Sequence, residues 1–324
     1  MAGVMTIYEP GGPEVFVRDE QPLPEPRDGE VLIRQEAIGL NYQDVYFRMG
    51  EFPGLEFPLV NGVEAAGVVA ATGPGVEEFA IGDRVAYRHV LGAYADARVV
   101  SQDELVHVPD DVSLEQCAGL LLKGLTADML VNACYRVGAR DTVLVHAAAG
   151  GTGSLICRLA RHRGATVVGI VGSEAKLEAI EPYVDHALLY GEDAAIEARL
   201  QELTEGHGID VVYDGVGRAT FDLSLNAVRR FGTVVLYGWA SGRPEPVGPL
   251  RLVQRSPFLI VPSGTNFYTA PEILRPAAER LFDALRSGLF GSTSITTYEL
   301  DDVARAHADL ESRKTSGSIV LVPR

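Results

Sequence analysis

A run of small residues, AAAGGTG at positions 147–153, follows the apolar segment Thr142–His146 and precedes a stretch with helical periodicity. Against the dinucleotide-binding pattern G-x-G-x-x-G, Ala148 takes the first glycine position, Gly150 the second and Gly153 the third. Gly150 would let the backbone approach a pyrophosphate, and Gly153 would let the helix pack closely on the strand. The anion would lie at the helix N-terminus, where amides and dipole favour negative charge. A tight turn without a ligand is the alternative.

The type of nucleotide depends on the residues at the end of the second strand of such a unit. An NAD-selective site usually carries an acidic residue about 20 residues after the glycines. Here the strand at 166–171 ends in Gly172 and Ser173, and Lys176 comes one turn later. Small residues, a hydroxyl and a cation suit a 2′-phosphate, which predicts NADPH. Glu174 opposes this interpretation unless it faces solvent.

Tyr190 ends the third strand of the same unit and could add a stacking face or a hydroxyl to the nucleotide site. Its alternative role is that of an ordinary aromatic residue at the end of a sheet.

The glycine run is positioned by alternating strands and helices. Near-continuous Val, Leu and Ile strands that alternate with helices indicate a parallel sheet covered on both faces, an α/β doubly wound fold. Expected strands are 142–146, 166–171, 187–189, 209–213, 233–237 and 259–261, and expected helices are 153–163, 174–180, 194–203 and 220–229.

The rest of the chain has a different pattern. Short strands at 30–34, 60–72, 84–87 and 95–100, separated by Gly and Pro turns, predict a β-rich antiparallel unit. Two helices are expected at 114–122 and 127–135. The tail predicts helices at 271–287 and 301–311 and a strand at 317–322. The arrangement that fits best is a discontinuous β-rich domain, 1–124 and 265–324, with a Rossmann domain at 125–264 inserted into it.

Composition limits the classes of function. With 324 residues the chain is long enough for about two domains. Lys plus Arg number 28 and Asp plus Glu number 44, which gives a net charge of −16. Such an acidic chain is a poor partner for nucleic acid or anionic membranes, because phosphate binding needs a cationic face.

Cysteine content and the N-terminus suggest a compartment. The 3 cysteines, Cys117, Cys134 and Cys157, are too few and too scattered for a disulfide framework or a cysteine-rich zinc site. The first residues lack the pattern of a signal peptide, and we expect no apolar run of membrane-spanning length. The prediction is a cytoplasmic protein.

Motifs along the whole chain resemble the quinone oxidoreductases of zeta-crystallin type, in the zinc-free branch of the medium-chain dehydrogenase/reductase superfamily. Each motif alone is weak, and together they are specific. They are GGPEV (11–15), AIGLNY (37–42), GVEAAG (62–67), GDRV (82–85), LKGLT (122–126), AAAGGTG (147–153), VYDGVG (212–217) and RKTSG (313–317).

The resemblance implies a GroES-like catalytic domain, a Rossmann domain, NADPH bound between them and a homodimer joined through the Rossmann sheets. It implies that the nicotinamide and its ribose contact Asn41, Asp44, Tyr46 and Thr126. It implies further cofactor contacts from Gly150, Gly151, Thr152, Gly153, Gly172, Ser173, Lys176, Tyr190, Tyr237, Gly238, Trp239 and Arg313. Trp239 and Phe52 transfer less securely, because side chains at these positions vary in the family.

The same resemblance argues against zinc. Zinc-dependent members of the superfamily carry Gly-His-Glu where this chain has Gly62-Val63-Glu64, so a ligating His is replaced by Val63. The four-cysteine structural site is also absent, and the seven His residues form no HExxH-like pair. Alcohol oxidation, which needs a Lewis acid for the alkoxide, is therefore not expected.

Hydride transfer to an electron-poor acceptor remains. We expect an NADPH-dependent quinone reductase in which Tyr46, Asn41 or Lys123 positions the substrate or its developing oxyanion. Tyr46 could instead only stack on the cofactor, and Lys123 could orient a ribose or the domain junction. Two alternatives stay open: an enoyl or enone reductase, which also needs a proton donor near the α-carbon, and a non-catalytic NADPH-binding protein.

Overall fold

The structure is a computed structural model that describes residues 1–291, 294–312, 315 and 317–324. The chain forms two compact units. Unit 1 comprises Met1–Lys123, Tyr268–Arg286 and Ser292–Arg324, and unit 2 comprises Gly124–Phe267 and Ser287–Gly291.

Unit 1 is built on two sheets. The small sheet has the order β2-β1-β4, and the large sheet has the order β15-β16-β3-β5-β6-β8, with β7 also paired to β3. The strands are β1 (Ala2–Ile7), β2 (Phe16–Gln21), β3 (Glu30–Leu40), β4 (Leu59–Val60), β5 (Glu64–Thr72), β6 (Arg84–Arg88), β7 (Ala97–Ser101), β8 (Val106–His107), β15 (Ile295–Glu299) and β16 (Ser318–Val322).

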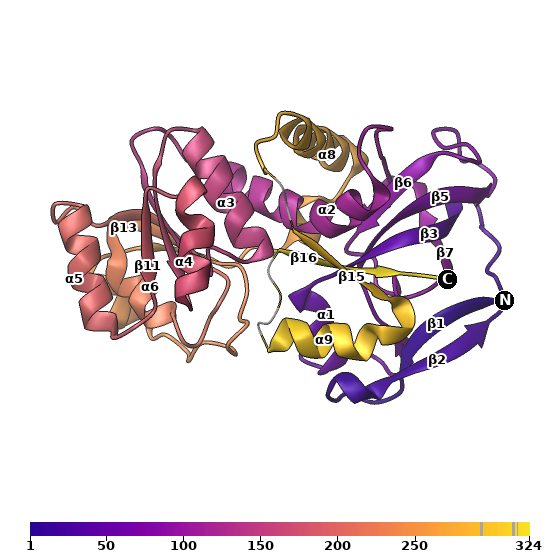
Figure 1. Ribbon diagram of the computed structural model, residues 1–324, viewed down its shortest axis with the longest axis horizontal. Helices are drawn as coiled ribbons and strands as arrows, with labels where there is room; N and C mark the ends of the chain where they lie inside the picture. The colour runs from indigo at the N-terminus through magenta and orange to yellow at the C-terminus, as the bar shows by residue number, and fades with distance from the viewer. Residues whose placement is uncertain (292–293, 313–314, 316) are drawn as a thin grey trace. The chain divides into compact units, whose positions relative to one another are not determined.

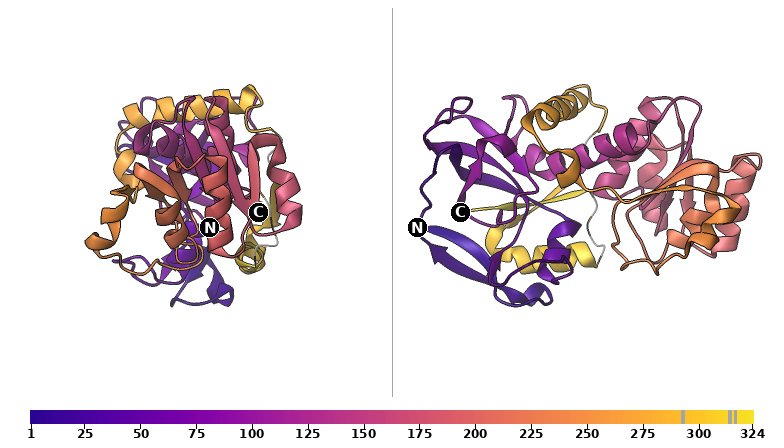
Figure 2. Two further views of the ribbon diagram at one scale, coloured as in Figure 1. Left: turned by 90° about the vertical axis from the view of Figure 1, so that its left-hand side faces the viewer. Right: turned by 180° about the vertical axis from the view of Figure 1, so that it is seen from behind.

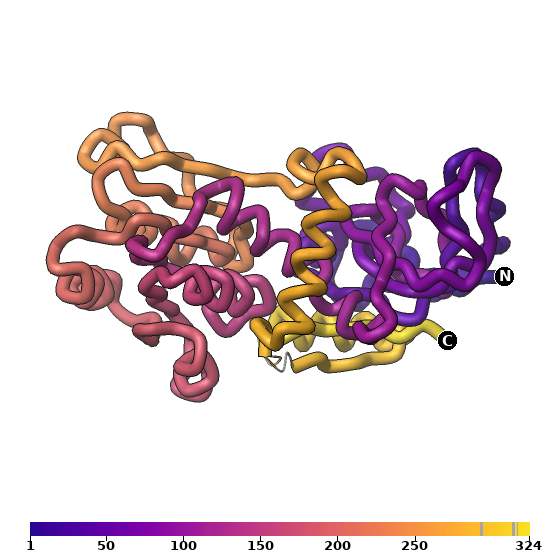
Figure 3. The backbone as a smooth tube through the Cα atoms, turned by 90° about the horizontal axis from the view of Figure 1, so that it is seen from above, coloured from indigo at the N-terminus to yellow at the C-terminus, as the bar shows by residue number. Residues whose placement is uncertain are grey.

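Helices cover the large sheet of unit 1 on two sides. α9 and the β1–β2 hairpin lie on one side, and α8 lies on the opposite side (Figures 1 and 2). α8 contacts β8 and η2. The view from above shows α8 along its whole length (Figure 3). The helical segments are η1 (Pro13–Val15), α1 (Tyr42–Arg48), η2 (Gln102–Glu104), α8 (Pro271–Arg286), η6 (Leu300–Asp302) and α9 (Val303–Glu311).

The main core of unit 1 joins strands that are distant in the sequence. Ile33 and Ile38 of β3 pack with Val85 of β6, Val303 of α9 and Leu321 of β16. The C-terminal segment therefore completes the core that the first strands begin.

Unit 2 is a six-stranded parallel sheet with the order β11-β10-β9-β12-β13-β14. This is the order of a doubly wound nucleotide-binding fold, in which ligands bind beyond the carboxyl ends of the strands. The strands are β9 (Thr142–His146), β10 (Thr166–Val171), β11 (His186–Leu189), β12 (Ile209–Asp214), β13 (Val228–Leu236) and β14 (Phe258–Ile260).

Helices cover both faces of this sheet, with α3 and α4 on one side and α5 on the other (Figure 1). Ile196 and Leu200 of α5 and Phe221 of α6 pack on Leu144 and Val212 of the central strands. The helical segments are α3 (Gly151–His162), α4 (Glu174–Ile180), η4 (Glu181–Tyr183), α5 (Asp193–Leu203), α6 (Phe221–Ala227), η5 (Pro249–Gln254) and α7 (Gly264–Phe267).

The mixed α/β fold and the parallel sheet confirm the expected fold class, but three local features differ from the predictions. The strand predicted at 30–34 is the eleven-residue β3. The sequence did not predict α1. Two helices were predicted at 114–122 and 127–135, whereas α2 (Leu114–Met129) is continuous and ends in a π turn at Leu130–Cys134.

The continuity of α2 also corrects the expected absence of a long apolar helix. Gly124 lies within α2 and does not end it, because the mainly apolar residues on either side of it are buried. By length and composition Leu114–Cys134 could cross a membrane, but 72% of its apolar window is buried inside the protein. Such burial is typical of a core helix.

Candidate functional site

In unit 2 the glycine turn connects β9 directly to α3. Gly150 precedes the helix in an extended conformation, and its amide donates to the Ala147 carbonyl at 2.8 Å. A Cβ at Gly153 would lie 2.5 Å from that carbonyl oxygen, so a larger residue cannot be accommodated without moving backbone. The expected packing role of Gly153 is therefore visible. The amides of Gly151 and Thr152 lie in the first turn of α3, where no intrahelical acceptor exists.

The segment after β10 is open. Gly172 and Ser173 are exposed, and a Cβ at Gly172 would meet nothing within 4 Å. Lys176 is half-buried in the first turn of α4, and its side chain makes no hydrogen bond or ion pair with the residues that the structure describes. Glu174 is exposed, as the assignment to a 2′-phosphate requires. The segment can therefore present a small-residue turn and one cation to an anionic ligand.

Tyr190, directly after β11, lies against the glycine turn. Its hydroxyl accepts from the Ala147 amide at 3.0 Å and is 3.1 Å from Nδ1 of His146. The tyrosine and imidazole rings are parallel within 3°, with centroids 5.9 Å apart. The carboxyl ends of β9 and β11 are thus linked through side chains.

The strand ends β12 and β13 carry the next group of predicted residues. Tyr237 is half-buried, and its amide donates to the Asp214 carbonyl at 2.9 Å. Gly238 lies close to the Gly215 backbone, where a Cβ would be 3.0 Å from the carbonyl oxygen. Trp239 is half-buried, with the Arg243 guanidinium 5.8 Å from the centre of its ring. Unit 2 therefore gathers most of the predicted cofactor residues at one edge of its sheet.

Two predicted residues stand apart from this edge. Thr126 is half-buried on α2, and its position alone does not define a ligand site. Arg313 lies outside the residues that the structure describes.

In unit 1 the start of α1 connects three buried polar residues. Asn41 precedes the helix and its amide donates to Oδ2 of Asp44 at 2.8 Å, half of a capping box. The Asn41 side chain donates to Oε2 of Glu64 at 2.8 Å. Glu64, at the start of β5, also accepts from the Leu122 amide. The three side chains are almost fully buried, so Asn41 is fixed from two directions.

Lys123 completes this group. Its ammonium donates to the Leu40 carbonyl at 3.4 Å, and burial lowers its pKa while the Glu64 and Asp44 carboxyls oppose that change. Burial raises the pKa of Glu64, with Lys123 as the main opposing charge. Burial raises the pKa of Asp44 to about 7, against the stabilising Asn41 amide and Tyr94 hydroxyl. Burial thus shifts both carboxyls toward the protonated form, compared with exposed carboxyls.

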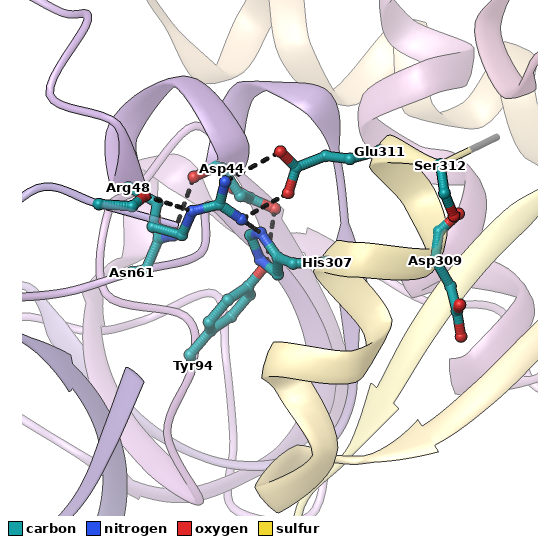
Figure 4. Close-up of polar contacts among 9 residues, drawn as sticks. Asp44, Arg48, Asn61, Tyr94, His307, Asp309, Glu311 and Ser312 are labelled. Atoms are coloured by element: carbon teal, nitrogen blue, oxygen red, sulfur yellow. Dashed lines mark hydrogen bonds and ion pairs between the residues drawn. The ribbon is translucent and has the colours of Figure 1, made fainter. Parts of the chain in front are cut away.

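A hydrogen-bonded chain connects Asp44 to α9 (Figure 4). Arg48 binds both carboxylate oxygens of Glu311 at 2.6 and 3.0 Å and lies 3.0 Å from Nδ1 of His307. Arginine can only donate, so Nδ1 accepts and Nε2 carries the proton. That proton points at the Tyr94 hydroxyl at 3.0 Å, which donates to Oδ2 of Asp44 at 3.0 Å.

The other oxygen of Asp44, Oδ1, is buried and has no hydrogen-bond partner in the described part of the chain. Because Oδ2 accepts two donors, Oδ1 is the oxygen left to carry the proton when the carboxyl is neutral.

Aromatic side chains surround Tyr46, which is 9% exposed. Its ring centroid is 6.2 Å from that of Tyr42 and 6.3 Å from that of Phe52. The ring centroids of Phe47 and Phe52 are 4.7 Å apart in an edge-to-face arrangement. Both rings pack in one apolar cluster with Val63, Leu122, Leu55 and Leu91. These residues form an apolar aromatic cluster in unit 1.

The donor set does not fit a metal ion. Val63, at the position of the expected ligand, is buried within the apolar cluster. Among the residues described, no group of three or more His, Cys, Asp and Glu side chains is arranged to hold a metal.

Several buried polar residues were not predicted as part of a site. Glu64 was visible in the GVEAAG motif as a carboxyl within an apolar segment, which is a usable signal. Tyr94 and His307 had no such signal, because Tyr94 meets Asp44 across 50 residues of chain and His307 meets Tyr94 across 213. His146, which the sequence did not single out, is fully buried in the chain of contacts at Tyr190.

Comparisons with known proteins extend over the whole chain. Residues 27–110 match the family described as alcohol dehydrogenase GroES-like domain, and residues 151–282 match the family described as zinc-binding dehydrogenase. A quinone oxidoreductase of Salmonella typhimurium is 39% identical, and a 2-haloacrylate reductase of a Burkholderia species is 38% identical. Both alignments cover 100% of each chain.

A solved structure agrees with these relatives. The crystal structure of Escherichia coli quinone oxidoreductase complexed with NADPH is 35% identical and superposes with a TM-score of 0.95. The match covers 99% of this chain and 100% of that one.

Proposed function

This chain belongs to the quinone oxidoreductase family of the medium-chain dehydrogenase/reductase superfamily, and we propose that it is an NADPH-dependent quinone reductase. The observation that carries the proposal is the full-length similarity to quinone oxidoreductases at 37–39% identity.

The residues of unit 2 fit NADPH. The first turn of α3 offers amides to a pyrophosphate, and the segment Gly172–Lys176 offers space and a cation to a 2′-phosphate. Tyr237, Gly238 and Trp239 follow β13 at the same edge of the sheet. We propose that these residues, together with Asn41, Asp44, Tyr46, Thr126 and Arg313, hold the cofactor.

When bound, NADPH supplies the hydride from C4 of its nicotinamide. The chain contributes position and charge stabilisation. The cluster around Tyr46 provides a flat apolar surface for a quinone ring, and the Tyr46 hydroxyl is the donor for the developing oxyanion. Asn41 is held by Glu64, so its orientation is fixed before substrate arrives. The ammonium of Lys123, which donates to the Leu40 carbonyl, partly offsets the negative charge of the buried Glu64 and Asp44 carboxyls.

We propose further that the reaction uses no metal, that the protein is cytoplasmic and that it forms a homodimer through unit 2. Val63 and the surrounding apolar residues support the first statement. Three free cysteines fit a reducing compartment. The exposed edge strand β14 supports the dimer.

Reduction of an activated carbon–carbon double bond is the second candidate function. The 2-haloacrylate reductase relative, matched over its full length, favours it. Such a substrate needs a proton at the carbon next to its carbonyl after hydride addition.

The test is NADPH oxidation by the purified protein with a panel of substrates: 1,4-benzoquinone, a naphthoquinone, a 2-alkenal, an enone and 2-chloroacrylate. We expect the highest kcat/KM with the quinones and no loss after treatment with EDTA. Turnover of the alkenes alone would support the second candidate, and turnover of none of them would exclude both.

A further inference from the structure

A chain of buried polar groups runs along the carboxyl edge of the sheet in unit 2. His146 is the last residue of β9, and Asp214 is the last residue of β12; both are fully buried. The hydroxyl of Ser224 on α6 lies between them, 3.1 Å from Nε2 of His146 and 2.7 Å from Oδ2 of Asp214. On its other side His146 meets the Tyr190 hydroxyl at 3.1 Å.

The direction of each hydrogen bond is set by Asp214. Its carboxylate is surrounded by donors: the amides of Val216 and Gly217 and the hydroxyls of Thr220 and Ser224. Ser224 has one proton. The charged acceptor at 2.7 Å takes it in preference to the Thr220 carbonyl at 3.1 Å.

The Ser224 oxygen must then accept from His146, which places the imidazole proton on Nε2. Nδ1 is left as an acceptor for the Tyr190 hydroxyl proton. The Tyr190 oxygen in turn accepts the Ala147 amide at 3.0 Å. Every proton in the chain therefore points from the glycine turn toward Asp214.

The residue at the start of this chain has an unusual backbone. Ala147 has a φ of 51°, the left-handed region that costs a residue with a Cβ about 1–2 kcal/mol. Its carbonyl accepts the Gly150 amide at 2.8 Å and lies against Gly153. The conformation of Ala147 thus sets the path of the turn and the position of the first amides of α3.

We propose that His146 is a positioning residue for NADPH: it orients the Tyr190 hydroxyl onto the Ala147 amide, and Ser224 and Asp214 fix the imidazole tautomer that makes this possible. His146 itself does not touch the cofactor. The inference rests on the proposed function, because it assigns the Gly150–Gly153 turn to the pyrophosphate. It also revises the expected role of Tyr190, whose hydroxyl proton points at His146 and away from a phosphate.

The tautomer is tested without any ligand. In the uniformly ¹⁵N-labelled full-length protein at pH 7, we expect His146 to be neutral with its proton on Nε2. Its signals are assigned by their loss in His146→Gln. In Ser224→Ala the Nε2 proton loses its acceptor, and we expect a mixture of tautomers. A proton on Nδ1 in the wild-type protein would overturn the proposal.

The effect on the cofactor is tested by fluorescence titration with NADPH. We expect Tyr190→Phe and His146→Leu each to raise Kd about 3- to 10-fold, the range for one net hydrogen bond. The value of kcat at saturating NADPH should stay within about twofold. Because the two residues act through one contact, the double variant should be no weaker than the weaker single variant.

Tyr213→Phe is the matched control, since it removes a buried tyrosine hydroxyl that donates to the Leu130 carbonyl at 3.1 Å in the same unit. Its Kd should equal that of the wild-type protein. Additive effects in the double variant, or an equal effect of the control, would contradict the proposal. Failure of the wild-type protein to bind NADPH would instead remove the proposed function, and the tautomer would still report on the chain of contacts.

Discussion

Lys176 is the residue on which the choice between NADPH and NADH depends in this chain. It lies one helical turn beyond Gly172 and Ser173, with the exposed Glu174 directed to solvent. A charge-assisted contact to a 2′-phosphate contributes about 1.5–3 kcal/mol, or roughly 10- to 100-fold in affinity.

Lys176→Ala should therefore raise KM for NADPH by about 10-fold or more and leave KM for NADH within about twofold. Steady-state kinetics with one quinone and both cofactors measures this. Arg199→Ala removes another cation of unit 2, one already paired with Glu202 at 2.9 Å, and should change neither KM. Equal effects of Lys176→Ala on both cofactors would remove the 2′-phosphate assignment.

The raised pKa of Asp44 predicts how the stability of the protein depends on pH. Its pKa of about 7 in the folded protein lies above the ordinary value of 3.8, so the folded state retains a proton that the unfolded state loses. Stability therefore falls as the pH rises from about 4 to about 7, by up to ~1.4 kcal/mol for each pH unit. Asp44→Asn keeps the acceptor for Asn41 and Tyr94 and removes the titration.

Denaturant unfolding of both proteins at pH 5 and pH 8 tests this. The free energy of unfolding of Asp44→Asn, minus that of the wild-type protein, should be larger at pH 8 than at pH 5. Burial lowers the pKa of His307 well below 6.5, which gives an opposite pH trend, but His307 is present in both proteins and cancels. Identical pH profiles would show that Asp44 does not titrate in this range.

At the residue scale, the sequence could predict the contents of a local motif. Asn41 and Asp44 were named because the family resemblance carries over residues of one short segment. Their partners were not, since Glu64, Tyr94 and His307 come from β5, the loop after β6 and α9. The pKa of Asp44 depends on those partners and on burial, neither of which a single sequence shows.

The turn between β9 and α3 is the element whose shape the proposed function requires. Gly153→Ala would place a methyl group 2.5 Å from the Ala147 carbonyl oxygen, and backbone must move to relieve it. Overpacking of this kind costs about 1–3 kcal/mol. We expect Gly153→Ala to lower the free energy of unfolding by that amount and to raise Kd for NADPH.

Gly191→Ala provides the comparison, because a Cβ there meets nothing within 4 Å and the residue is exposed. It should leave both quantities unchanged. If Gly153→Ala unfolds with the same free energy and binds NADPH with the same Kd as the wild-type protein, the turn tolerates a displaced Ala147.

At the element scale, the parallel sheet was predictable because strands and helices alternate with strong periodicity. Helix α1 was not, since its seven residues make barely two turns and begin directly after β3. The division of α2 into two helices was wrong because burial keeps the helix continuous through Gly124. Tertiary packing decided both cases.

At the scale of the whole molecule, charge and exposed apolar surface indicate different partners. The net charge of −16 disfavours nucleic acid. Exposed apolar side chains in unit 2 gather around β14, an edge strand whose outer backbone groups are unpaired in the sheet. Leu250 and Val253 lie on η5, and Phe258 and Val261 are 60% and 61% exposed.

An edge strand of this kind, without the charged residues that usually protect one, is a site for strand pairing. Pairing with β14 of a second copy joins two identical patches by a twofold axis, which closes the assembly as a dimer. We expect the wild-type protein to have twice the chain mass by light scattering coupled to size-exclusion chromatography. Phe258→Asp with Val261→Asp should give the monomer mass, because the carboxylates would face each other across the axis.

The control is Ile81→Asp, which places the same charge on an apolar side chain that is 71% exposed in unit 1. It should remain a dimer. A monomeric wild-type protein would exclude the dimer, and a dimeric double variant would move the interface away from β14. Because the residues of unit 2 that we propose for NADPH lie at the carboxyl edge of the sheet and β14 lies at its side, the monomeric variant should still bind NADPH with the wild-type Kd.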